Sequence, residues 1–313
     1  MVCSFLSGCS LFQSDDDDDN TTLMLLLLAA SQSSTSNPCS GSGASTGSTI
    51  SNTTATLTGG TNGCLNGVTT SMDSALPSWI KNNFTCSVGY VVGDYYCFKS
   101  KNLPNHASYY WTRNGTVGTN AALDAGLPTL DGTTYTAAGT NRIGSQNFVY
   151  AIPKNPTRNT GSLTGTQGGL SSIGITRNGV AIFNNAAAPG DTLATEATTF
   201  DAFGAHPNDQ SITHHHAWVK KFSTDQSATS TTSYNDDTNL IGIALDGYAI
   251  YGIRCSGQGN ATASGLDTLH GHTTTTTDFA TATYHYHFVL DSTATIKTLM
   301  GSYFYGKIGQ VSN

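Results

Sequence analysis

The chain has 313 residues, a formal net charge of −7, and only 11% charged residues. Lys and Arg form no cluster, which excludes nucleic acid and anionic membrane surfaces as partners held by charge. Abundant Gly, Ser, Thr and Asn favour strands joined by turns over helices. We therefore expect a mainly β protein, sandwich- or barrel-like.

The first residues predict export and attachment to a membrane. Leu6-Ser7-Gly8-Cys9 matches the lipobox of bacterial lipoproteins, in which the cysteine is acylated and becomes the first mature residue, and an acidic tract follows at 15–19. Residues 1–9 thus predict a lipoprotein signal, with Cys9 as the lipidation site and the cell envelope as the destination. The competing candidate is the apolar run at 23–30, which is long enough for the core of a signal peptide and would give a secreted protein.

Two regions follow the signal. Residues 10–75 are rich in Ser, Thr and Gly with almost no aromatic residues, so they bury too little apolar surface to fold and predict a disordered stalk. Aromatic residues begin at Trp79, and we expect residues 76–313 to form the β domain. Apolar runs predict its strands at 85–98, 106–112, 147–152, 172–183, 212–220, 240–251, 283–290 and 300–306.

Cysteine usage agrees with an oxidising compartment. Cys86 and Cys97 end a strand–turn–strand pattern, so we expect a disulfide between them. Cys39 and Cys64 would then pair within the stalk. Cys255 would be left over, either free or exchanged with one of those four. No cysteine has the spacing of a zinc finger.

The domain contains an internal repeat. Residues 173–182 and 241–250 share six identities in ten positions. In each copy Asn178-Gly179 or Asp246-Gly247 separates two short apolar runs, which is the strongest signal for a two-residue β-hairpin. A loop carrying Asp and His follows each hairpin, and a His-x-His strand comes next. The pseudo-repeats span about 172–220 and 240–290.

Eight of the nine histidines fall in the two repeats. The aligned candidate ligands are His206 with His272, His214 with His285, and His216 with His287. Alternate residues of a strand share a face, so each His-x-His projects two imidazoles together, and the loop before it supplies a third. Three imidazoles predict a transition-metal site for zinc or copper with one coordination position open. The alternatives are acid/base histidines without a metal and structural histidines.

Several details of these sites stay open at this stage. Asp201 and Asp267 are either further ligands or acceptors for the second ring N–H of a ligand histidine. His270 stands two residues from His272 and is a further candidate, although it and His215 lack a counterpart in the other copy and are expected in loops or at the surface. The two repeats would form either one dinuclear centre of six imidazoles or two separate mononuclear sites.

The second repeat resembles a known family, the YHYH domain, named after the tetrapeptide at 284–287. The matching segments are 245–252, 266–267 and 283–287, with 178–183, 200–201 and 204–207 in the first copy and 102–106 and 152–156 upstream. The resemblance covers about residues 75–310, and it adds His106 as a candidate ligand or outer-shell residue. The first copy departs from the pattern with Thr213-His214-His215-His216, and Thr268 stands where many relatives carry Cys. The resemblance implies a secreted context and assigns no activity.

Three functions fit these observations. The first is an exported, lipid-anchored protein that binds a transition metal. The second is a metal-dependent enzyme, hydrolytic or oxidative, in which the open position activates water or oxygen and Asp246, Asp267 or His270 acts as general base. The third is a surface adhesion or interaction module whose histidines only brace loops.

Overall fold

The computed structural model describes residues 36–41, 64, 68–106, 108, 110, 112–113, 116–117, 141–166, 172–201, 203–216, 236–256, 263–290, 297–299 and 301–313. Residues Asn37–Asn313 form one compact unit, separate from Met1–Ser36. Cys9, the apolar run at 23–30 and most of the predicted stalk lie outside the described residues. Within the described part, no helix has the length and apolarity needed to cross a membrane.

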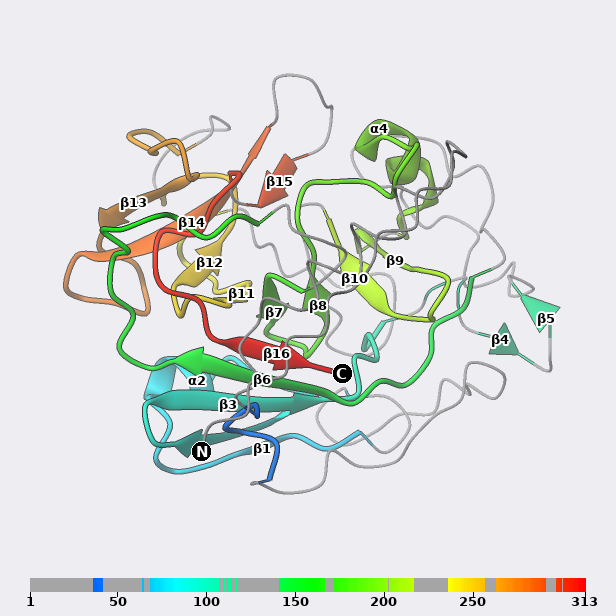
Figure 1. The fold of residues 1–313 in the computed structure, drawn as a ribbon, viewed down its shortest axis with the longest axis horizontal. Helices are drawn as coiled ribbons and strands as arrows, with labels where there is room; N and C mark the ends of the chain where they lie inside the picture. Colours follow the sequence, from blue (N-terminus) through cyan, green and yellow to red (C-terminus); the bar gives the residue numbers. More distant parts are fainter. Residues whose placement is uncertain are drawn as a thin grey trace, which may run out of the picture. The chain divides into compact units, whose positions relative to one another are not determined.

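The regular structure is almost entirely β, which confirms the predicted fold class (Figure 1). The first sheet contains β1 (Ser71–Met72), β2 (Val88–Val92), β3 (Tyr95–Ser100), β6 (Phe148–Pro153) and β16 (Gln310–Ser312). The second contains β7 (Gly174–Thr176), β8 (Ala181–Ile182), β9 (Ala205–Pro207), β10 (Thr213–His215), β11 (Gly242–Ala244), β12 (Ala249–Tyr251), β13 (Gly271–Thr274), β14 (Thr283–Leu290) and β15 (Lys297–Leu299). A small ribbon pairs β4 (Thr112–Arg113) with β5 (Thr116–Val117). The helical turns are α2 (Ser78–Lys81), α4 (Leu193–Glu196) and η3 (Ala197–Thr199).

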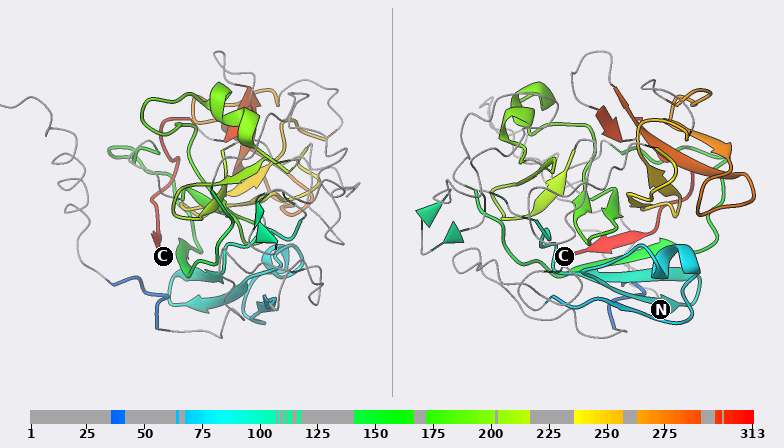
Figure 2. Two further views of the ribbon diagram at one scale, coloured as in Figure 1. Left: turned by 90° about the vertical axis from the view of Figure 1, so that its right-hand side faces the viewer. Right: turned by 180° about the vertical axis from the view of Figure 1, so that it is seen from behind.

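The two sheets share one apolar core. Phe98 and Tyr150 of the first sheet belong to the same buried cluster as Ile175, Ile243 and Tyr286 of the second. Figure 2 shows the first sheet as a layer beneath the second in both further views. The first sheet therefore supports the strands that carry the repeated pattern.

The second sheet is pseudo-symmetric. Its strand order is β13-β14-β12-β11-β7-β8-β10-β9, so each strand of one repeat has its counterpart at the mirrored place. β7 and β11 meet antiparallel at the centre, where Ile175 pairs with Ile243, its own equivalent in the repeat. A Cβ at Gly174 would lie 2.6 Å from the carbonyl oxygen of Ile243, and one at Gly242 would collide with that of Ile175. The repeated glycines therefore allow the two copies to join into one sheet.

This order separates the two His-x-His strands. β12, β11, β7 and β8 lie between β14 and β10. At about 4.8 Å per strand, five steps across the sheet put the strands roughly 24 Å apart. The histidines of the two strands therefore form two separate clusters and not one shared centre.

Local structure differs from the sequence prediction in a few places. The hairpins at Asn178-Gly179 and Asp246-Gly247 close over three residues rather than two, since Thr176 N donates to Val180 O and Ala244 N to Tyr248 O. Gly179 and Gly247 take the left-handed conformation, with φ of 83° and 94°, which suits a type I turn followed by a bulge. Residues 301–306 form isolated bridges rather than a strand, and β9, β13 and β16 occur where no strand was predicted.

The predicted Cys86–Cys97 disulfide is wrong in its pairing, although both cysteines are disulfide-bonded. Cys97 is bonded to Cys39, and Cys86 to Cys64. The register of the β2–β3 hairpin explains the difference, because Tyr90 lies opposite Cys97 and Cys86 lies four residues before Tyr90. Four residues of strand span roughly 13 Å, and a disulfide joins Cα atoms less than about 7 Å apart.

The described parts of the predicted stalk are attached to the domain. Cys39 and Cys64 are both fully buried. Tyr90 also donates a hydrogen bond to the carbonyl oxygen of Cys39, at 2.6 Å. Ser71–Met72 adds a parallel edge strand beside β2. These segments are therefore part of the folded unit.

Candidate metal centres

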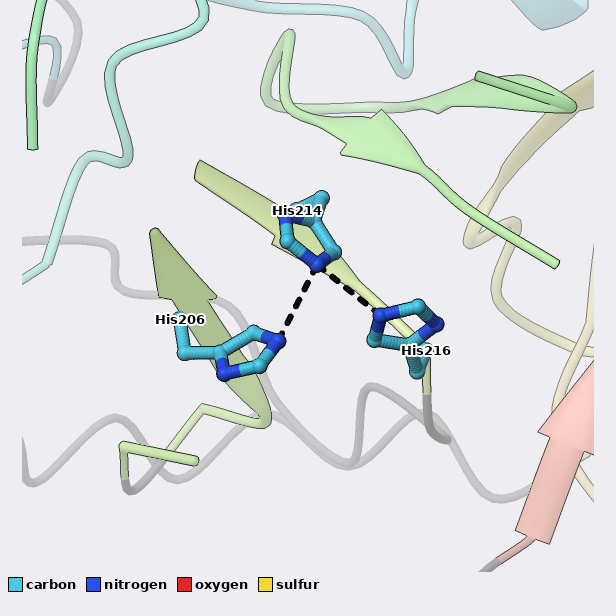
Figure 3. A group of neighbouring side chains, drawn as sticks. All are labelled: His206, His214 and His216. Atoms are coloured by element: carbon cyan, nitrogen blue, oxygen red, sulfur yellow. Dashed lines mark hydrogen bonds between the residues drawn. The ribbon is translucent and has the colours of Figure 1, made fainter. Parts of the chain in front are cut away.

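Three histidines of the first repeat meet at one point, and we call them site A: His206, His214 and His216. His206 comes from β9, and His214 and His216 come from β10 and the residue after it (Figure 3). The Nε2 atom of His214 lies 3.0 Å from that of His206 and 2.9 Å from that of His216. β9 and β10 pair with His206 opposite His214, so strand register creates the cluster. His206 is thus brought by a strand and not by the predicted loop.

The second ring nitrogen of each histidine has a partner that fixes the tautomer. The Nδ1 of His214 lies 3.0 Å from Ile212 O, and that of His216 lies 2.6 Å from Asn184 O. Carbonyl oxygens only accept, so both Nδ1 atoms carry the proton. The Nδ1 of His206 lies 2.8 Å from Thr199 Oγ1, whose own hydroxyl donates to Glu196 O at 2.7 Å. All three Nε2 atoms therefore present lone pairs to one another.

Three lone pairs at this distance do not hydrogen-bond to one another, and a proton on one ring is unfavourable. Burial lowers the pKa of His206 to about 3 and that of His216 to about 4, and it lowers that of His214 well below its usual range. Phe183 stacks on His214 with ring centroids 4.1 Å apart and adds an apolar wall. A buried group of neutral imidazoles sharing one focus is the arrangement that a transition-metal ion requires.

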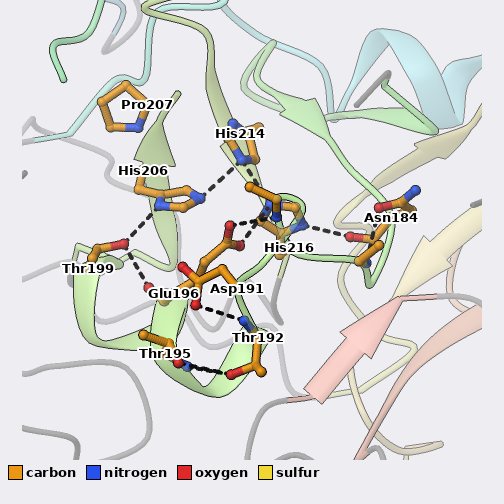
Figure 4. A network of polar contacts seen from close by, with 12 residues as sticks. Asn184, Asp191, Thr192, Thr195, Glu196, Thr199, His206, Pro207, His214 and His216 are labelled. Atoms are coloured by element: carbon orange, nitrogen blue, oxygen red, sulfur yellow. Dashed lines mark hydrogen bonds and ion pairs between the residues drawn. The ribbon is translucent and has the colours of Figure 1, made fainter. Parts of the chain in front are cut away.

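Glu196, which the sequence did not suggest, lies beside His216 of site A (Figure 4). It ends α4, whose N-cap Thr192 accepts from Thr195 N. The Ala188 N–H donates to Glu196 Oε1 at 3.1 Å, and Oε2 lies 3.4 Å from His216 Nε2. Oε2 is buried without a hydrogen-bond partner among the described residues, and burial raises the pKa of the carboxyl. The position expected to be open therefore faces a carboxylate oxygen.

The second repeat forms site B from His272, His285 and His287. The Nε2 of His272, on β13, lies 3.2 Å from that of His285 and 3.2 Å from that of His287, both on β14. β13 and β14 pair with His272 opposite His285, as the equivalent strands do in site A. The two His-x-His strands therefore have the same pairing, and the third histidine of each site, His206 or His272, lies on the neighbouring strand.

The outer contacts of the two sites also correspond. His285 Nδ1 donates to Thr283 O at 2.9 Å, two residues earlier in the chain, as His214 Nδ1 donates to Ile212 O. His287 Nδ1 donates to Gly252 O at 2.7 Å. Gly252 is the repeat equivalent of Asn184. Burial lowers the pKa of His285 and brings that of His287 to about 3. The same tautomers thus aim three Nε2 lone pairs into site B.

The fourth donor at site B is a different residue, Cys255. Its Sγ lies 3.6 Å from His272 Nε2, and Cys255, His272 and His287 offer ligand atoms within 4.8 Å of one another. Burial and the nearby Asp237 raise the pKa of this thiol, so it is protonated until a metal displaces the proton. His272 and Cys255 are partly exposed, whereas His285 and His287 are buried.

The donor distances in both sites are close to those of a tetrahedral site, although the donors that all lie within 4.8 Å of one another are His206, His214 and His216 in site A, and Cys255, His272 and His287 in site B. Metal–nitrogen bonds of about 2.0–2.1 Å place two ligand nitrogens about 3.3 Å apart, and a longer metal–sulfur bond places S and N about 3.6 Å apart. Site A shows 2.9, 3.0 and 3.4 Å. Site B shows 3.2, 3.2 and 3.6 Å. Shifts of a few tenths of an ångström would accommodate an ion in either.

The predicted aspartates accept hydrogen bonds from backbone N–H groups of the turns before the histidines. Asp201 Oδ1 accepts from Phe203 N and Ala205 N, and Asp267 Oδ1 accepts from Leu269 N and Gly271 N. Asp201 Oδ2 also accepts from a histidine ring, that of His106 rather than one of site A. The role of the two aspartates as metal ligands stays a prediction. They fix the strands that carry His206 and His272, because short polar side chains of this kind satisfy turn N–H groups.

The remaining histidines take other positions. His106 Nε2 lies 2.9 Å from Asp201 Oδ2, and its ring stacks on Phe203, so it braces a turn. His215 is 1% exposed, contrary to the expectation of a loop or surface residue, and its Nδ1 lies 3.0 Å from Gly204 O. His270 has φ of 66° in the turn before β13. His215 lies between the candidate ligands His214 and His216 and points to the opposite face, as the alternation requires.

Metal-free protein should lose stability in acid. The six ligand histidines protonate near pH 6.5 when unfolded, and burial holds the pKa of His206 and His287 at about 3 when folded. Between these values the unfolded chain binds more protons, so the free energy of unfolding falls as pH falls. Asp246 has a smaller, opposite effect on the free energy of unfolding: burial raises its pKa to about 6, so the folded chain binds this proton more readily than the unfolded chain. Urea unfolding of chelator-treated protein at pH 7.5 and pH 5 should show the loss, and equal stability at both would contradict it.

Tyr286→Phe should separate stability from metal binding. Tyr286 lies between His285 and His287 but faces the core, where its hydroxyl donates to Asp246 Oδ2 at 2.7 Å and accepts from Tyr305 N at 2.7 Å. Losing both contacts should cost about 2 kcal/mol in the free energy of unfolding. Metal content should be unchanged. Loss of metal in this variant at a temperature where it is folded would refute the assignment of faces.

One of three comparisons with known proteins found a match. Residues 149–264 match the family model described as YHYH protein, which confirms the predicted resemblance over that range. The match includes all of site A and Cys255, and it ends before His272 and the Tyr284–His287 tetrapeptide. No curated protein and no solved structure matches the chain.

Proposed function

The chain carries a YHYH family domain at residues 149–264, and from this premise we propose that it is an exported protein that binds two transition-metal ions, zinc or copper, one in each repeat. The observation that supports this proposal is the repeated triad of neutral Nε2 atoms. Each is aimed by an Nδ1 contact on its far side, as is usual for metal-ligating histidines. Nitrogen-rich sets of this kind favour zinc or copper over calcium or magnesium.

Metal binding is favoured over metal catalysis by the fourth donors. A hydrolytic or oxidative site keeps a coordination position for water or substrate. In site A the Glu196 Oε2 atom lies 3.4 Å from His216 Nε2, and in site B the Cys255 Sγ atom lies 3.6 Å from His272 Nε2. A fourth protein donor beside the histidines is typical of sites that hold an ion rather than of catalytic sites, which keep a position open. An adhesion module would have no need of a tautomer-fixed triad in both repeats.

Elemental analysis tests this function. Protein without a His tag, purified from its native compartment, should contain two transition-metal ions per chain. Chelation should remove them and lower the thermal unfolding temperature, since binding to the folded state alone adds stability. Protein that contains no zinc or copper, and takes up neither when offered, would reject metal binding and favour the adhesion module.

Export and lipid anchoring form the second part of the proposal. Two disulfides join Cys39 to Cys97 and Cys64 to Cys86, and disulfides persist in oxidising compartments. With a lipobox at Leu6-Ser7-Gly8-Cys9, they support a lipoprotein of the cell envelope. Cys9→Ala should abolish acyl labelling and release the protein from membranes. Membrane association that survives this change would refute lipid anchoring at Cys9.

A further inference from the structure

We infer that the two centres select different ions: Cys255 ligates through a thiolate and makes site B a centre for copper(I), whereas Glu196 makes site A a centre for a divalent ion such as zinc. This inference rests on the proposed function and adds an identity for each site. The two triads match each other, so any difference in preference must come from the fourth donor.

The repeat itself shows how the fourth donors are exchanged. The carbonyl oxygen that orients the last histidine belongs to Asn184 in site A and to Gly252 in site B. Three residues after these positions, Ala187 of the first repeat corresponds to Cys255 of the second. In site B the Cys255 side chain itself supplies a ligand atom, within 4.8 Å of those of His272 and His287. In site A the alanine provides no ligand, and the next N–H, that of Ala188, holds Glu196 in place. The residue at this one position of the repeat, Ala187 or Cys255, thus determines whether the fourth donor atom is oxygen or sulfur.

The status of the cysteines points in the same direction. Cys39, Cys64, Cys86 and Cys97 are paired in two disulfides, and Cys255 is the free cysteine of the described part. A partly exposed thiol in an oxidising compartment is open to oxidation. Coordination protects it, because the sulfur electron pair is then engaged by the ion.

Ligand softness sets the preference. Thiolate with imidazole suits copper(I), whereas a carboxylate oxygen suits harder divalent ions and adds little for copper(I). Copper(I) binding at site B releases the thiol proton to solvent and forms the S–Cu bond, with no change in oxidation state. His272 and Cys255 are partly exposed, so an incoming carrier ligand can reach site B. In site A Glu196 is likewise partly exposed, and His214 and His216 are buried.

Cobalt(II) gives the first test. Metal-free protein titrated with Co²⁺ without oxygen should bind two ions and develop a thiolate-to-cobalt charge-transfer band. Cys255→Ser should lose this band and keep the d–d absorption of site A. Thr274→Val is the matched control, because it removes a hydroxyl 3.4 Å from His272 Nε2 without removing the thiolate, and the band should remain.

Copper(I) gives the second test, by competition against a copper(I) chelator. Cys255→Ser should weaken copper(I) binding by more than the roughly 10–100-fold that loss of an outer-shell partner costs. Glu196→Gln should leave copper(I) affinity unchanged and lower zinc affinity at site A. Asp191→Asn controls for loss of a carboxylate near Glu196 and should change neither affinity.

A measurement on the wild type avoids dependence on variant folding. One equivalent of copper(I) should protect Cys255 from alkylation, and one equivalent of zinc, placed first in site A, should protect it less. Two bound Co²⁺ ions without a thiolate band, or copper(I) affinity unchanged in folded Cys255→Ser, would overturn this inference and leave the proposed metal binding intact. A wild type that binds no metal would overturn both.

Discussion

Replacing His214 with Ala should empty site A and leave site B filled, and His285→Ala should do the reverse. Each histidine supplies one of the three Nε2 donors of its site. With one of them replaced by Ala, the two remaining histidines should bind the ion too weakly to retain it. The ligand strands lie roughly 24 Å apart, five strand spacings across one sheet, so the two sites should not share a ligand. Metal analysis after dialysis should therefore fall from two ions per chain to one in either variant.

The controls for these variants lie on the same strands. His215→Gln alters the buried histidine between His214 and His216, and Tyr286→Phe alters the residue between His285 and His287. Both side chains lie on the face away from the ligands, so both variants should retain two ions. An outcome in which either ligand variant loses both ions would indicate a shared centre and contradict the strand order.

Removing the Cys39–Cys97 cross-link should be the largest stability loss outside the metal sites. The two cysteines are 58 residues apart, against 22 for Cys64–Cys86. A longer closed loop restricts the unfolded chain more, so the free energy of unfolding should fall by about 4 kcal/mol for the first and about 3 kcal/mol for the second. Both cysteines of a pair should be replaced by Ser, so that no new free thiol remains, and unfolding should be followed in urea.

Peptide mapping provides the check on pairing. Non-reduced digests should yield a peptide that joins residues 39 and 97 and another that joins 64 and 86. Both double variants should keep two metal ions, since neither disulfide touches a site. A digest that joins Cys86 to Cys97 would contradict the hairpin register from which the pairing follows.

The repeat and the histidine faces could be predicted from the sequence because they depend on local geometry. Alternation along a strand places His214 with His216, and His285 with His287, whatever the rest of the fold does. The Asn-Gly and Asp-Gly turns likewise act within a few residues. The separation of the sites could not be predicted, since it depends on which strands of the two repeats meet at the centre of the sheet.

The fourth donors and the disulfides depend on contacts that sequence does not encode locally. Glu196 lies beside His216 because the fold brings the end of α4 next to the end of β10, and the Ala188 N–H orients its carboxylate. The sequence identifies Cys255 only as a cysteine left over from the disulfides, because its position beside His272 depends on the fold. The contacts of the aspartates also depend on the fold: an Asp before a turn can accept from turn N–H groups, from a histidine or, like Asp201, from both, and spacing alone does not distinguish these cases.

The most direct test of two separate histidine centres is anomalous X-ray scattering from crystals of the untagged protein loaded with zinc. We expect two peaks, one roughly 2.0–2.1 Å from the Nε2 atoms of His206, His214 and His216, and one at the same distance from those of His272, His285 and His287. A single peak shared by both triads, or two empty triads in zinc-soaked crystals, would contradict the assignment.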